Sequence, residues 1–135
     1  MSKRIKKLSQ KEIEALYKRL VAILWSANSR NKFEGVLSDL LTESEEVMLA
    51  KRMSIIFLLD QGFSGYRIHK TLKVSQGTVS YIAKKRDTGA YANLQTIFCR
   101  KQEKEDMWKY IEVVLRAGLP ERGKGRWSSL NTSTR

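Results

Sequence analysis

Residues 64 to 86 read SGYRIHKTLKVSQGTVSYIAKKR, the segment with the clearest structural pattern in the sequence. Its apolar residues are Ile68, Leu72, Val74, Val79 and Ile82. The first two lie one helical turn apart, as do the last two, and Val74 falls between the pairs at a tight turn. Two short helices with this spacing can cross and pack their apolar sides against a common support. The pattern therefore predicts a helix-turn-helix.

The second of these helices carries the residues that predict a function. Ser75 is a good N-cap, because its hydroxyl can accept a hydrogen bond from a backbone N–H of the first turn. After it, glutamine can read adenine through paired hydrogen bonds, and serine or threonine can contact base edges. Basic residues, Arg86 among them, surround this polar surface and suit the phosphate backbone. The predicted DNA-binding residues are Arg67, Lys70, Lys73, Ser75, Gln76, Gly77, Thr78, Ser80, Tyr81, Lys84 and Lys85.

The plainer interpretation of the same stretch is an ordinary αα-hairpin with a solvated basic face. The 135-residue chain carries 26 Lys and Arg against 14 Asp and Glu, a formal net charge of +12. Such an excess favours polyanions, nucleic acid first and an anionic membrane surface second. Together with the small polar residues of the second helix, the charge favours double-stranded DNA as the partner.

Local signals place further helices before this segment. Ser9 with Glu12, and Thr42 with Glu45, have the spacing of capping boxes, in which side chains satisfy the first backbone N–H groups of a helix. A short helix is predicted between them, over residues 33–41. The helix that begins at Thr42 is apolar around much of its circumference, as expected of a central buried element.

The chain is predicted to be all-α throughout its folded part. Gly62 is the expected end of the helix that begins at Thr42. After residue 90 comes either one long helix or two helices that meet in the charged stretch RKQEKED, residues 100–106. The predicted organisation is a basic N-terminal arm at 1–8, a helical DNA-binding and dimerisation domain at 9–118 and a flexible basic tail at 119–135.

Single residues give little sign of chemistry. Cys99 is the only cysteine and His69 the only histidine, so neither a catalytic dyad nor a metal site is predicted, and the chain is not expected to be an enzyme. His69 is interpreted as a partly exposed helix residue. Trp25 and Trp108 lie at helical apolar spacing and are expected in the core or in a dimer interface. No apolar stretch approaches membrane-spanning length, which predicts a cytoplasmic protein without membrane contact.

From Phe33 to about Ile82 the sequence resembles the Trp repressor family. The stretch that carries the resemblance is residues 40–82, LLTESEEVMLAKRMSIIFLLDQGFSGYRIHKTLKVSQGTVSYI. The shared features are an LT-x-x-E helix start, Arg52 within that helix, Gly62 at its end and a reading helix that contains T-[IV]-[ST], here Thr78-Val79-Ser80. The order of helices fits the family over roughly residues 9–98. The resemblance implies an all-helical, intertwined homodimer that places two reading helices in successive major grooves.

The resemblance also implies a place for a ligand. In the family, tryptophan lies between two arginines and near a threonine at the LT helix start. Thr42 and Arg52 match two of these positions, but Tyr81 stands where the second arginine is expected. A tyrosine cannot supply a cation for the ligand's carboxylate. No cofactor is therefore predicted, and L-tryptophan as a corepressor would lack part of its clamp.

The function favoured by these observations is a sequence-specific, double-stranded DNA-binding transcriptional regulator, with repression implied by the resemblance. Two alternatives from other classes stay open. One is a DNA-recognition or architectural subunit of a transposition or recombination system. The other is a basic helical module that binds RNA or acidic proteins.

Overall fold

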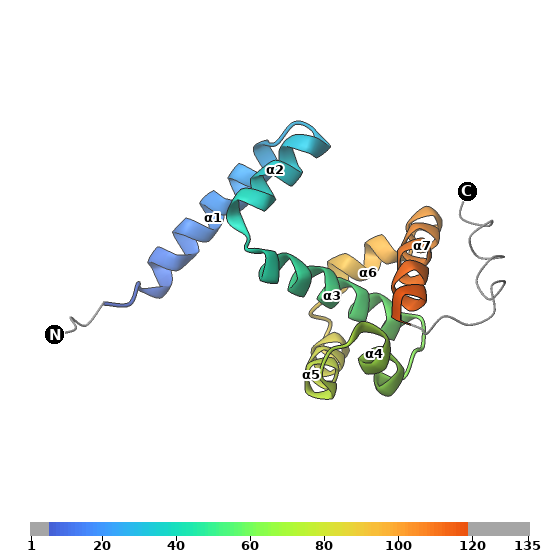
Figure 1. The fold of residues 1–135 in the computed structure, drawn as a ribbon. Helices are drawn as coiled ribbons and strands as arrows, with labels where there is room; N and C mark the ends of the chain where they lie inside the picture. The colour runs from blue at the N-terminus through green and yellow to red at the C-terminus, as the bar shows by residue number, and fades with distance from the viewer. Residues whose placement is uncertain (1–5, 119–135) are drawn as a thin grey trace. The chain divides into compact units, whose positions relative to one another are not determined.

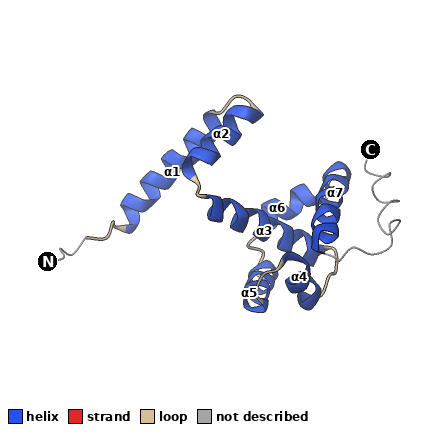
Figure 2. Cartoon of the chain, in the orientation of Figure 1, coloured by secondary structure: helices blue, strands red, loops and turns tan. Residues whose placement is uncertain are grey.

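A computed structural model describes residues 6–118, and all regular secondary structure in this part of the chain is α-helical (Figures 1 and 2). The helices are α1 (Gln10–Ser26), α2 (Arg30–Leu40), α3 (Glu43–Asp60), α4 (Gly65–Leu72), α5 (Gln76–Asp87), α6 (Ala92–Phe98) and α7 (Lys101–Gly118). The all-α prediction is confirmed. The predicted tail at 119–135 and most of the arm at 1–8 lie outside the described residues.

The chain divides into two compact units, residues 1–46 and residues 47–135. In the first unit, α1 and α2 pack against each other as a helical hairpin (Figure 1). The capping box of Ser9 and Glu12 is present and starts α1 as predicted. The start of α2 was predicted too late. The Ser29 hydroxyl accepts a hydrogen bond from the backbone N–H of Lys32, so the helix begins at Arg30.

Neither α1 nor α2 contains a buried residue. Their exposed large apolar residues are Ile13, Leu16, Tyr17, Val21, Ile23, Trp25, Phe33 and Leu40. Trp25 is 88% exposed, so a position in the core of its own chain is wrong for this residue. The hairpin therefore presents an apolar surface that its own two helices leave uncovered.

The α3 helix begins as predicted but is buried only in its second half. Thr42 and Glu45 form the reciprocal side-chain and backbone hydrogen bonds of a capping box. Val47 and Met48 are exposed, so the expectation of a helix buried along its length is wrong for its first half. Gly62 follows the helix end with a φ of 90°, a conformation that suits glycine.

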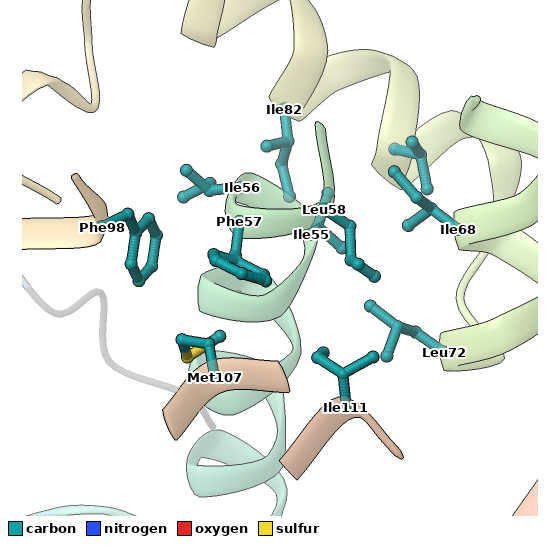
Figure 3. Close-up of a cluster of buried hydrophobic side chains, with 11 residues drawn as sticks. Ile55, Ile56, Phe57, Leu58, Ile68, Leu72, Ile82, Phe98, Met107 and Ile111 are labelled. Atoms are coloured by element: carbon teal, nitrogen blue, oxygen red, sulfur yellow. The ribbon is translucent and has the colours of Figure 1, made fainter. Parts of the chain in front are cut away.

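The core of the second unit forms around the C-terminal half of α3 (Figure 3). Its buried members are Ile55, Ile56, Phe57, Leu58, Ile68, Leu72, Val79, Ile82, Phe98, Met107 and Ile111. All four apolar positions that were predicted to face inward from the helix-turn-helix lie in this cluster, and Val74 packs against it. The Phe57 ring meets the rings of Phe98 and Trp108 edge to face, each at 5.3 Å between centroids.

The charged stretch 100–106 is a joint followed by a helix start rather than the middle of one helix. The α6 helix ends at Phe98 and α7 begins at Lys101. Both helices turn apolar side chains toward α3, Phe98 from α6 and Met107 from α7, while Lys101 and Lys104 remain exposed. The α3 helix is therefore packed by α6 and α7 as well as by the helix-turn-helix. This packing holds in place the helix against which α4 and α5 pack.

Candidate nucleic-acid interface

Helices α4 and α5 form the helix-turn-helix, and local hydrogen bonds define both of its helix starts. The Ser64 hydroxyl accepts from the backbone N–H of Arg67 at 3.2 Å, and the Ser75 hydroxyl accepts from that of Thr78 at 3.0 Å. Between the helices, Lys73 adopts a left-handed conformation with φ 56° and ψ 51°. The prediction that Ser75 starts the second helix is confirmed.

His69 holds the turn together. Its Nδ1 lies 2.5 Å from the carbonyl oxygen of Val74. Because a carbonyl can only accept, the Nδ1 of His69 carries the hydrogen and donates it across the turn. The residue is half-buried, and its ring also lies 6.0 Å from that of Tyr66. The interpretation of His69 as a partly exposed helix residue is confirmed, but the sequence did not predict this contact, since spacing says nothing about which carbonyl the ring meets.

The outward side of α5 carries small and polar side chains. Gln76, Gly77, Ser80 and Tyr81 are exposed, while Val79, which packs into the core, is buried. The hydroxyls of Ser75 and Thr78 lie 2.8 Å apart and bond to each other. These two predicted DNA-binding residues are thus engaged in starting the helix, which leaves Gln76 and Ser80 as the free polar groups on its first turns.

Exposed cations surround these polar groups. Lys73 and Lys84 are exposed, as is Lys70, whose ammonium lies 5.7 Å from the centre of the Tyr66 ring. The guanidinium of Arg67 stacks 4.2 Å above Phe63, and the ammonium of Lys85 lies 5.5 Å from the Tyr81 ring. The sequence contains no Asp or Glu from residue 61 to residue 86, so nothing acidic within this segment opposes the positive field.

Arg86 is engaged within the chain and is not one of the free cations. Its Nε lies 2.6 Å from the Oδ1 of Asp60, at the end of α3. The side-chain amide of Gln95 in α6 donates to the same oxygen at 2.9 Å. This brace joins the C-terminal end of α5 to α3 and α6.

A surface residue that the sequence interpretation missed is Tyr66 in α4. Its side chain is 59% exposed. It lines a crevice between α4 and α5 together with Gln76 and Ser80. The only signal in the sequence was its place one turn before Lys70, which any exposed helix residue would share.

The three positions matched to the family's ligand site are all exposed. The Thr42 hydroxyl accepts from the backbone N–H of Glu45 and so serves the start of α3. Arg52 is exposed on α3, and Tyr81 is 60% exposed on α5. A role for these residues in holding a ligand stays a prediction.

Residues 6–118 contain no cluster of three or more His, Cys, Asp or Glu side chains arranged to hold a metal ion. Over the same range, none of the helices has the length and apolar character needed to cross a membrane.

The fold and this surface define a helix-turn-helix protein with a basic outer face. The family model described as Trp repressor protein matches residues 14–102, more than half of the chain. The chain belongs to this family, which is one of helix-turn-helix DNA-binding regulators. Comparison with curated proteins and with solved structures gave no match.

Proposed function

We propose that this protein is a sequence-specific, double-stranded DNA-binding transcriptional regulator that reads the major groove with α5. The observation that carries the proposal is the exposure of Gln76, Gly77 and Ser80 at a capped helix start, among cations and without acidic residues nearby in sequence. An α-helix fits the major groove, where glutamine can pair with adenine and lysine with phosphate. Repression is the direction of regulation that the family supports.

The partner that we propose for α1 and α2 is a second copy of the chain. A unit of this size buries too little surface to be stable alone, and apolar surface of this extent marks an interface. Trp25 and Tyr17 are 88% and 62% exposed, so they would gain most from burial against a partner. In an intertwined homodimer, as the resemblance implies, the apolar faces of the two copies cover each other. Two symmetric reading helices then match a near-palindromic DNA site.

Sedimentation of the full chain tests the dimer. We expect a homodimer, and Leu16→Glu should weaken it at least tenfold, because a charge would enter an apolar interface. Leu16 is 60% exposed in the single chain, so the same change does little to a monomer. Asn31→Glu, an exposed polar position on α2, is the control and should leave the dimer intact. A wild-type chain that sediments as a monomer at micromolar concentration would contradict the proposal.

Two alanine substitutions distinguish recognition of DNA bases from contact with the phosphate backbone. Gln76→Ala should lower the ratio of specific to random duplex affinity by about tenfold, because it removes a base contact. Lys84→Ala should weaken both duplexes alike and reduce the slope of log affinity against log salt by about one. Fluorescence anisotropy over a range of salt concentrations measures both effects. An unchanged preference in Gln76→Ala would show that α5 is not the reading helix.

Recovery of genomic fragments bound by the protein distinguishes the proposal from its alternatives. We expect one recurring, near-palindromic site beside a few promoters. Recovery of the ends of mobile elements would instead favour a recombination subunit. A preference for RNA over every duplex would favour the basic interaction module, and uniform binding to all DNA would contradict site-specific regulation.

A further inference from the structure

The crevice between α4 and α5 has a volume of about 230 Å³. Its lining residues are Leu59, Gly65, Tyr66, Gln76, Val79, Ser80 and Ala83. The lining is apolar where Leu59, Val79 and Ala83 contribute, and Val79 is 2% exposed at its base. The polar groups of Gln76 and Ser80, which are exposed, stand at its edge. The crevice thus combines an apolar depression with hydrogen-bonding groups on the outward side of the helix-turn-helix.

The lining and the volume of the crevice exclude a phosphate group and an ordinary metabolite as its occupant. None of the lining side chains is charged, so a phosphate group inside the crevice would find no cation in the lining itself. The volume also falls below the roughly 300–1,000 Å³ of ordinary metabolite sites. What fits is a small apolar group attached to a larger polar edge.

We propose that this crevice receives the C5-methyl edge of a thymine in the major groove, so that the protein's DNA site carries an A·T pair there in each half-site. The inference rests on the proposed function and adds the identity of the base. The thymine methyl is the apolar group that the major-groove edges of the four bases present. Beside it, the Gln76 amide can donate to N7 and accept from the N6 amino group of an adenine. Methyl and amide together select thymine and adenine over cytosine and guanine.

Single replacement of each thymine by deoxyuridine in a selected duplex tests this. The change removes one methyl group and leaves every hydrogen-bonding atom in place. We expect one position in each half-site to lose about fourfold in affinity, the value of one buried methyl group, and the other thymines to lose less than twofold. Titration of the full chain by fluorescence anisotropy measures the loss.

Gly65→Ala provides the matched variant. A Cβ at Gly65 would lie 3.6 Å from Cγ1 of Val79, an ordinary van der Waals contact, so the fold holds while the crevice narrows. In this variant the ratio of thymine to uracil affinity should fall toward one. Asn93→Ala, an exposed position on α6, should keep the wild-type ratio. Thermal unfolding of both variants confirms that they are folded.

The outcomes separate this inference from the proposed function. Absence of any duplex preference in the wild type would overturn the proposed function and this inference with it. Selective duplex binding in which no thymine position is sensitive to uracil would overturn this inference alone. A sensitive position that stays equally sensitive in folded Gly65→Ala would mean that the methyl is read outside the crevice, and would also overturn it.

Discussion

Phe57→Ala should lower the free energy of unfolding of the second unit by about 3–5 kcal/mol. The Phe57 side chain is fully buried in α3 and contacts the rings of Phe98 and Trp108 edge to face. Truncation removes the transfer free energy of the ring and leaves a cavity that three helices would have to close. A small domain is stable by only about 5–15 kcal/mol in total, so much of its stability is lost.

Urea unfolding followed by circular dichroism measures this loss. Tyr110→Ala is the control, because Tyr110 is 69% exposed on α7 and its truncation should cost less than about 0.5 kcal/mol. Similar effects of the two substitutions would mean that α3 is not the centre of the core. DNA binding by Phe57→Ala should weaken in parallel with its stability, since α4 and α5 rest on this core.

Asp60→Ala should destabilise the chain by about 2–3 kcal/mol and, despite the loss of a negative charge, weaken DNA binding. The Asp60 side chain is 17% exposed and accepts from Arg86 at 2.6 Å and from Gln95 at 2.9 Å. Its removal leaves the guanidinium and the amide without this acceptor and frees the C-terminal end of α5. Loss of a negative charge alone should strengthen binding to DNA. Weaker binding would therefore mean that α5 is no longer held in the position that binds DNA.

Asp87→Ala is the matched control for this prediction. Asp87 also faces Arg86, but at 3.6 Å, with a side chain that is 74% exposed. Exposed ion pairs contribute about 0–1 kcal/mol, so Asp87→Ala should barely change stability and should strengthen DNA binding slightly. Both substitutions change the net charge equally. If they give the same shift in affinity, the brace does not position the reading helix.

Local sequence signals were enough to predict three of the helix starts and the inward side of the helix-turn-helix. Ser9, Thr42 and Ser75 were identified as helix starts because a capping hydrogen bond joins residues only a few positions apart. The buried positions of α4 and α5 followed from helical periodicity, which is also local. The residues of α5 that do not belong to this apolar pattern were predicted to face outward, and the predicted base-reading residues are among them.

The tertiary structure alone decided how these elements are joined. It pairs Arg86 with Asp60, 26 residues away, and adds Gln95 from a separate helix, so a cation that the sequence leaves free is bound within the protein. It also shows Trp25 exposed, whereas its sequence pattern suits a core equally well. The crevice beside Gln76 exists only because α4 crosses α5 at this point. Periodicity fixes which side of a helix is apolar, but not which partner covers that side or which distant charge a side chain meets.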